Sequence, residues 1–343
     1  MDPVRQQYEA LPYPARDPKD EATRLIEGSP SHPVEIDHYL FQGRRDWSQP
    51  FCVLVAGGGT GDGLIMLAQK LADIGCPAEI TYLDMSEASR EIAEARAKAR
   101  GLDVTFITGD LLTAPEHGPF DYIDCCGVLH HLPDPDAGFA ALAQALSPDG
   151  GMGLMVYAPY GRSGVYPLQD AFGTLLGDDT PADKVRLGKA ALEILPDSHP
   201  FKVNAHLRDH KDSDAGFHDL LLHSRDRAYT IAEVSEALER AGLGLVSPVE
   251  SIRYDPARYL PDTPEMAERI KSLTPLQRMA VAEQLAGNIK THVVYAAPAA
   301  RASKVMARPT KPDLVPHLSG VAPGALAKQI MDKGRMTASF DNV

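Results

Sequence analysis

The sequence predicts an α/β fold built on a mostly parallel, doubly wound sheet. Three observations lead to this class. The apolar run Phe51–Ala56 feeds directly into five glycines within seven positions. The residues after the glycines repeat apolar side chains with the period of a helix. Further strand-like runs then alternate with helical patterns to about residue 160, as the crossover connections of a parallel sheet require.

The glycine turn itself indicates a ligand site. Strand, glycine turn and helix in this order let the backbone approach a ligand at the carboxyl end of the first strand. A Cβ there would clash with the ligand or forbid the positive φ angles of the turn. The chain has Gly-x-Gly-x-Gly at Gly57–Gly61, but no register gives Gly-x-Gly-x-x-Gly and no Gly-Lys-Ser/Thr follows. These absences argue against a dinucleotide turn and against a P-loop.

Four more strands are expected after the first, in the order that a repeated strand–helix unit gives. A second strand, Thr81–Asp84, ends in a carboxylate 23 residues after Gly61, which suits one βαβ unit. The third, fourth and fifth strands are expected in Val104–Leu112, Phe120–Cys126 and Met152–Ala158, the last after a turn at Ala145–Gly151.

In their order and spacing these elements resemble the class I S-adenosylmethionine-dependent methyltransferases, of the bacterial type 11/12-like kind. The resemblance runs from about residue 50 to residue 160 and includes the His-His-Leu segment after strand four. It implies a Rossmann-like seven-stranded sheet, S-adenosyl-L-methionine as cofactor and S-adenosyl-L-homocysteine as product. The cofactor-binding residues that it implies are Ala56, Gly57, Gly58, Gly59, Gly61, Asp84, Met85, Gly109, Asp110, Leu111, Cys126 and Gly127.

Two of these carboxylates have distinct roles in the resemblance, and one family feature is missing. Asp84 is expected to accept hydrogen bonds from both ribose hydroxyls, and Asp110 to lie beside the adenine amino group. The family's acidic residue before the first glycine influences the cationic methionine end of the cofactor, and this chain has Ala56 there. The methionine ammonium is then left to backbone carbonyls or to another carboxylate such as Asp62. The alternative is weakened cofactor affinity or a degenerate site.

The rest of the chain is divided around this core. Strands six and seven are expected at Gly244–Val249 and Thr291–Ala297, with a helix before strand six that begins at a capping box of Thr230 and Glu233. The expected parts are an N-terminal lid (1–46), the cofactor-binding core (47–160), a helical and loop insertion that caps the substrate (161–228), the completion of the sheet (229–298) and a basic C-terminal tail (299–343).

Methyl transfer from a sulfonium needs mainly alignment of a nucleophile, and a general base is optional. The candidate bases are His130 and His131, which the sequence does not distinguish; the alternative is that one caps backbone groups and the other packs against the cofactor loop. No metal site is expected, because the histidine-rich insertion lacks a His-Glu-x-x-His arrangement. The candidate substrate residues, each with a purely structural alternative, are Tyr8, Tyr13, Tyr157, Tyr160, Arg162, His218 and His223.

Composition sets the class of partner. The formal charge of −13 argues against general nucleic-acid binding, and residues 301–343 carry seven Lys or Arg against three Asp. No apolar run approaches the ~20 residues that span a bilayer, and the N-terminus lacks the apolar core of a signal peptide. We therefore expect a cytoplasmic methyltransferase, with no membrane partner, that acts on a protein side chain, a peptide or a metabolite by in-line SN2 transfer. The alternatives are a non-catalytic S-adenosylmethionine-binding module and, from another class, a nicotinamide-dependent oxidoreductase.

Overall fold

The computed structural model describes residues 2–308, 331–332 and 335–336. A seven-stranded sheet runs through it in the order β3-β2-β1-β4-β5-β7-β6, and β7 is antiparallel to both of its neighbours. This is the predicted mostly parallel, doubly wound class. The strand order reverses between β1 and β4, which places a ligand crevice at their carboxyl ends. The strands are β1 Phe51–Ala56, β2 Ala78–Asp84, β3 Thr105–Thr108, β4 Phe120–Cys126, β5 Leu146–Tyr157, β6 Leu243–Pro248 and β7 Thr291–Pro298.

Both faces of the sheet are covered, so its strands are apolar on both sides. Alternate residues of β1 show this: Val53 and Val55 belong to one buried cluster, Leu54 and Ala56 to another. The first face packs against α2 (Pro33–Leu40) and α3 (Asp62–Asp73), with α4 (Glu87–Arg100) beside them. The second packs against α5 (Pro135–Ala145) and α11 (Ile231–Arg240). The capping box of Thr230 and Glu233 at the start of α11 is confirmed.

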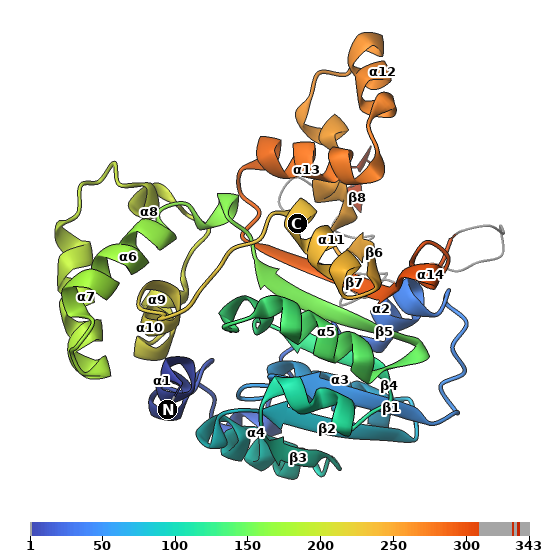
Figure 1. Cartoon of the computed structure of the whole chain (residues 1–343), viewed down its shortest axis with the longest axis horizontal. Coiled ribbons are helices and arrows are strands. Elements are labelled where there is room, and N and C mark those ends of the chain that lie inside the picture. Colours follow the sequence, from blue (N-terminus) through green and yellow to red (C-terminus); the bar gives the residue numbers. More distant parts are fainter. Residues whose placement is uncertain (1, 309–330, 333–334, 337–343) are drawn as a thin grey trace.

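The insertion after β5 forms a helical lobe at one side of the sheet (Figure 1). It has a small apolar core of its own, which includes Val165, Phe172, Phe201 and Phe217. The N-terminal helix α1 (Pro3–Ala10) lies next to this lobe, close to α10 (Figure 1). The elements of the insertion are η4 Tyr160–Arg162, α6 Val165–Leu176, α7 Pro181–Ile194, α8 Pro200–Val203, α9 Asp209–Asp212 and α10 Asp214–Leu221.

The connection from β6 to β7 forms a second projection, away from the carboxyl end of β1 (Figure 1). It contains η5 (Ser251–Tyr254), η6 (Pro256–Tyr259), α12 (Pro264–Ser272) and α13 (Pro275–Ala286), and no residue of α12 is buried. The remaining elements are η1 Pro18–Ala22, η2 Leu111–Glu116, η3 Leu129–His131, α14 Ala299–Ala302, β8 Met331–Asp332 and β9 Arg335–Met336. Among the described residues, no helix is both long and apolar enough to cross a bilayer.

One expectation about a boundary is wrong. Strand β5 begins at Leu146 rather than Met152, because Leu146 pairs with Phe120 and a register shift before Tyr122 absorbs the expected turn. The start of the expected basic tail is packed on the body: Val305 is buried, and its carbonyl accepts a hydrogen bond from the Gln42 N–H at 2.8 Å. Most of the tail beyond residue 308 lies outside the described residues.

Candidate active site

A cavity of about 350 Å³ lies at the carboxyl ends of β1, β2 and β4, where the strand order reverses. Its lining includes Gly57–Gly59, Asp84–Met85, Gly109–Leu111 and Cys126–Val128. These residues follow four different strands of the parallel part of the sheet. The cavity therefore brings together most of the predicted cofactor residues, in one continuous space.

The glycine turn is shaped by close approach as well as by backbone angle. Gly57 and Gly59 have φ values of +69° and +51°, in the left-handed region. A Cβ on Gly57 would lie 2.3 Å from a methyl group of Val128, and one on Gly58 would lie 2.4 Å from the ring of Tyr82. Only bare backbone leaves room for the cavity between these side chains. Gly61 does not line the cavity; with φ +99° it starts α3 and lies against Ala93 of α4.

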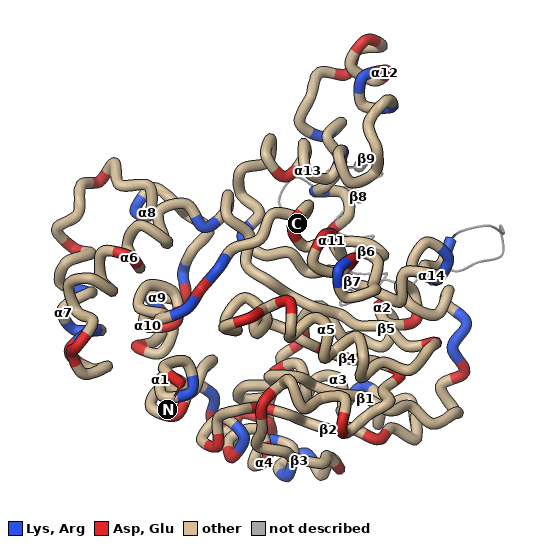
Figure 2. The backbone as a smooth tube through the Cα atoms, viewed as in Figure 1, with Lys and Arg blue, Asp and Glu red and all other residues tan. Residues whose placement is uncertain are grey.

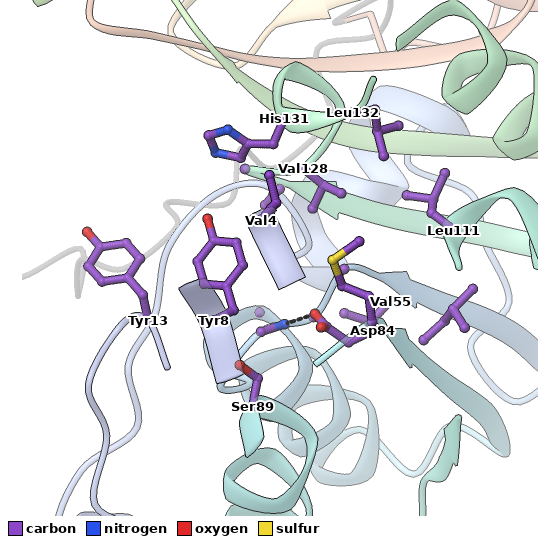
Figure 3. A pocket seen from close by; sticks show the side chains of 18 of the residues that line it. Val4, Tyr8, Tyr13, Val55, Asp84, Ser89, Leu111, Val128, His131 and Leu132 are labelled. Carbon is purple, nitrogen blue, oxygen red and sulfur yellow. Dashed lines mark hydrogen bonds between the residues drawn. The ribbon is translucent and has the colours of Figure 1, made fainter. Parts of the chain in front are cut away.

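Asp84 lies at the end of β2 and is held by the backbone. Its two carboxylate oxygens accept hydrogen bonds from the N–H groups of Gly59 and Ser86, each at 2.8 Å. Burial raises the pKa of this carboxyl, and these N–H donors oppose the rise. Each oxygen keeps a second lone pair for a ligand hydroxyl. Figure 3 shows the bond to Gly59 and Asp84 in the pocket below Tyr8 and His131.

An apolar slot adjoins Asp84. Leu83, Leu111, Val128 and Leu132 line it, and Gly109 and Asp110 lie at the same part of the cavity. Asp110 caps η2, because its Oδ1 accepts a hydrogen bond from the Leu112 N–H at 2.9 Å. Such a slot fits a flat aromatic base with polar groups at its edge.

The opposite end of the cavity is polar and is made by side chains. Tyr8 of α1 donates a hydrogen bond to one oxygen of Asp219 at 3.0 Å, and Tyr157 of β5 donates to the other at 3.2 Å. The Tyr8 hydroxyl also lies 3.4 Å from Nε2 of His223. Burial raises the pKa of the Asp219 carboxyl, and the neighbouring His131 and the Tyr8 hydrogen bond oppose the rise.

The two candidate histidines occupy different places. His131 lines the cavity, and its Nδ1 lies 2.8 Å from the carbonyl oxygen of Arg225. A carbonyl only accepts, so we assign the proton of the neutral ring to Nδ1, which leaves a lone pair on Nε2. His130 does not line the cavity, and neither ring nitrogen has a partner. Burial lowers the pKa of His130 well below the usual value. The centre of the His130 ring lies 4.1 Å from the centre of the His131 ring and 4.1 Å from that of Tyr157.

The predicted substrate residues are divided in the same way. Tyr8, Tyr13 and Tyr157 line the cavity. Arg162 does not; its guanidinium pairs with Asp226 at 2.9 Å and lies 3.6 Å from the centre of the Tyr157 ring. Its Nε also donates to the Tyr166 hydroxyl at 3.1 Å, so this side chain is held in a buried network away from the cavity. The predicted residues outside the lining are Tyr160, Arg162, His218 and His223, of which His223 stacks on His131 at 3.8 Å.

The prediction of Ala56 as a cofactor residue needs correction, and the candidate Asp62 is already paired. Ala56 is buried on the far face of the sheet with Leu54, and Val55 lines the cavity instead. Asp62 lines the cavity but already pairs with Arg16 and Arg96, each with a 2.8 Å bond to its Oδ1. Alternation along the strand, which places side chains on opposite faces, was the signal that identifies Val55.

Three charged lining residues were absent from the predicted set: Asp124, Asp219 and Arg225. Asp124 had a signal in the sequence, because it is a charged residue in the middle of a strand, between the apolar residues Ile123 and Cys125. Asp219 lies between the two predicted histidines of the insertion. Arg225 belongs to the connection from α10 to α11, where Figure 2 shows basic residues beside an acidic one.

Two clusters among the described residues have donor atoms close enough for a metal ion, with separations within 4.8 Å. They are His131, Asp219 and His223, and His130, His131 and Asp226. His223 Nδ1 accepts a hydrogen bond from the Arg225 N–H at 3.1 Å, so its Nε2 carries the proton and offers a donor rather than a lone pair. In the other cluster the cation of Arg162 already pairs with Asp226. Both arrangements fit hydrogen-bonded networks better than a metal centre.

Comparison with known proteins agrees with this geometry. Residues 53–150 match the family described as "Methyltransferase domain". The structure of PKMT2 from Rickettsia typhi in complex with AdoHcy superimposes with a TM-score of 0.59 at 15% identity, over 78% of this chain and 53% of that one. The core thus matches a methyltransferase domain in sequence and shares the fold of that AdoHcy-bound structure.

One relative is similar to this chain well beyond the core. An uncharacterized protein of Synechococcus sp. (syc1184_c) is 31% identical over 250 residues, which cover 71% of this chain and 59% of that protein. A ubiquinone biosynthesis O-methyltransferase of Alkalilimnicola ehrlichii is 35% identical over 141 residues, 39% of this chain and 51% of the relative. The chain thus spans little more than half the length of these relatives.

Proposed function

We propose that this methyltransferase moves the methyl group of S-adenosylmethionine to an acceptor held between His131, Asp219 and the tyrosines. The observation that supports this most is the continuity of the cavity. Asp84 and the glycine turn line the same space as His131, Tyr8 and Tyr157. A nucleoside bound at one end can therefore present its methyl group at the other without crossing a protein wall.

The residues present fit the cofactor. Asp84 would accept both ribose hydroxyls, the slot of Leu111 and Leu132 would hold the adenine, and the glycine turn would let the chain of the ligand pass over the backbone. The sulfonium supplies an activated methyl group: the acceptor forms a bond to the methyl carbon as the sulfur–carbon bond breaks, and the sulfur leaves as a neutral thioether. The protein contributes alignment and exclusion of water.

His131 is the proposed general base. Its Nδ1 bond to the Arg225 carbonyl orients the ring and leaves Nε2 as the acceptor of a proton. A ring nitrogen of His131 and a carboxylate oxygen of Asp219 lie within 4.8 Å of each other. The carboxylate would therefore stabilise the imidazolium that forms when His131 takes up a proton. The acceptor on this account carries a removable proton, as a hydroxyl or an ammonium does. His130 would act only by packing against His131.

The acceptor end is enclosed by the N-terminal helix and the insertion. Tyr8 closes it from α1 and Asp219 from α10, and the two are joined by a hydrogen bond. This enclosure favours a small molecule or a single extended side chain over a folded surface. We therefore place a metabolite or a side chain of a peptide or protein at this end.

Calorimetry with S-adenosylhomocysteine, followed by transfer of a tritiated methyl group from S-adenosylmethionine to extract fractions, tests the proposal. We expect one binding site per chain and a labelled fraction that depends on the protein. Binding without any labelled acceptor would favour the non-catalytic module, and absence of binding would contradict the proposal altogether.

A further inference from the structure

Asp124 is a carboxylate of the cavity that the proposed chemistry does not use. It lies in β4 directly beside Val55 of β1, because the two residues are partners in the parallel register. Partners in adjacent strands point to the same face of a sheet, and both residues line the cavity. Strand β1 itself, Phe51–Ala56, contains no acidic residue. The cavity wall next to the glycine turn thus has its carboxylate on the neighbouring strand.

The other carboxylates of the lining are already engaged. Asp62 pairs with Arg16 and Arg96. Asp219 accepts from two tyrosines at the acceptor end. Asp84 and Asp110 lie at the proposed ribose and adenine positions and accept backbone N–H groups.

Asp124 lacks a cation. Its partners are the hydroxyl of Ser31 and the thiol of Cys126, and no basic side chain of the described residues contributes to its environment. Burial raises its pKa to about 6. A buried carboxylate that is ionised near neutral pH is unfavourable unless a positive charge meets it. The missing positive charge points to a ligand.

The surroundings hold this carboxylate in place from behind. Ser31 is fully buried, and its φ of +92° is in the left-handed region that non-glycine residues seldom adopt. In this conformation its hydroxyl reaches Asp124 and lies 2.7 Å from the Tyr122 hydroxyl, while its N–H donates to Tyr295 at 3.0 Å. Strain of this kind persists where the surrounding structure fixes it, often at ligand sites.

The approach in front of Asp124 is kept open by a glycine. A Cβ on Gly63, at the start of α3, would lie 3.2 Å from Oδ2 of Asp124. Gly63 and Val55 both line the cavity there. A small cationic group can therefore reach the carboxylate from the glycine turn.

We propose that Asp124 binds the α-ammonium of the methionine part of the cofactor, in place of the acidic residue that β1 lacks. This role rests on the proposed function, because it presumes that S-adenosylmethionine occupies the cavity. It makes Asp124 a specificity residue: nucleosides with the amino-acid part would be preferred over those without it.

The test compares two nucleosides that differ in that part. S-adenosylhomocysteine carries the ammonium, and 5′-methylthioadenosine lacks the whole amino-acid portion. Calorimetry on the full chain should show at least tenfold tighter binding of S-adenosylhomocysteine to the wild type. Asp124→Asn should lower the affinity for S-adenosylhomocysteine about 10- to 100-fold, because a charge-assisted hydrogen bond is lost. The affinity for 5′-methylthioadenosine should stay within twofold of the wild-type value.

Two further variants sharpen the result. Asp121→Asn changes a carboxylate of the same strand that does not line the cavity, and it should alter neither affinity. Val55→Asp combined with Asp124→Asn returns an acid to the neighbouring strand position and should restore most of the lost affinity.

Each outcome is decisive. Unchanged S-adenosylhomocysteine binding in Asp124→Asn overturns the role of Asp124 alone, and so does an equal loss for both nucleosides. A wild-type protein that binds neither nucleoside overturns the proposed function and this role with it.

Discussion

The two ends of the cavity are built in different ways. At the end proposed for the cofactor, the shape comes from backbone: the turn Gly57–Gly59 approaches Val128 and Tyr82, and Asp84 is fixed by two N–H groups. At the end proposed for the acceptor, the shape comes from side-chain hydrogen bonds between elements that are far apart in the sequence. Tyr8 and Asp219 are separated by 211 residues. The first end is formed by the backbone of the sheet and its turns, whereas the second depends on the docking of α1 and the insertion.

If this division is correct, a substitution at one end changes only the property that depends on that end. These properties are the affinity for S-adenosylhomocysteine at the first end and the rate of methyl transfer at the second. Asp84→Ala should have the largest effect, because it removes the carboxylate proposed for both ribose hydroxyls. We expect S-adenosylhomocysteine affinity to fall at least 100-fold, on the order of 3 kcal/mol for two charge-assisted bonds, as measured by calorimetry. The thermal unfolding of the variant serves as a control for folding. An affinity within threefold of the wild type would refute the assignment of this end.

His131→Gln should act on the other end only. Methyl transfer to a labelled acceptor is expected to fall about 100-fold, within the usual range for loss of a general base, while S-adenosylhomocysteine affinity stays within threefold. His206→Gln, at an exposed position of the insertion, is the matched control. Equal rates in the wild type and His131→Gln would exclude proton transfer by this residue.

Asp124 gives a prediction about stability, because its pKa in the folded protein is about 6 against 3.8 for a free side chain. Between these pH values the folded state binds more protons, so the free energy of unfolding falls as pH rises from 4 to 6. The expected loss is about 2–3 kcal/mol, and it is present in full above pH 6. Asp124→Asn removes this loss. The free energy of unfolding of the variant, taken relative to that of the wild type, should therefore be higher at pH 7.5 than at pH 4.5.

The groups around Asp124 do not obscure that comparison. Ser31 does not titrate, and burial raises the pKa values of Tyr122, Tyr295 and Cys126 above the range used. Glu35, which is bonded to Tyr295, titrates in both proteins and cancels in the difference. Urea unfolding at the two pH values measures the effect, and a variant that loses stability equally at both would contradict the raised pKa.

Tyr8→Phe should have the smallest effect. It removes one hydroxyl from Asp219, and we expect about 1 kcal/mol less stability with S-adenosylhomocysteine affinity within twofold. A ninefold or larger fall in that affinity would show that α1 belongs to the cofactor end, and the division drawn above would fail. Differential scanning calorimetry and titration calorimetry give the two values.

The sequence predicted the parts that local patterns determine. The glycine turn, the carboxylate at the end of β2 and the cap of α11 each follow from residues a few positions apart. Alternation along β1 also places the side chains of Val55 and Ala56 on opposite faces of the sheet, so that only Val55 can line the cavity. Such features are readable because the backbone sets them.

The acceptor end was not predictable in the same way. No residue adjacent to Tyr8 in the sequence indicates that its hydroxyl donates to Asp219. Likewise, no residue adjacent to Arg162 in the sequence indicates that its guanidinium pairs with Asp226. These pairs form only when the insertion packs against the sheet. The early start of β5 has the same origin, since the pairing of Leu146 with Phe120 is a contact between separate strands.

The central claim is that one cavity holds the nucleoside at the glycine turn and directs its sulfur to His131. A crystal structure of the chain with S-adenosylhomocysteine tests it most directly. We predict both ribose hydroxyls on Asp84 and the sulfur facing Nε2 of His131. A nucleoside bound elsewhere, or a sulfur that points away from His131, would contradict the account.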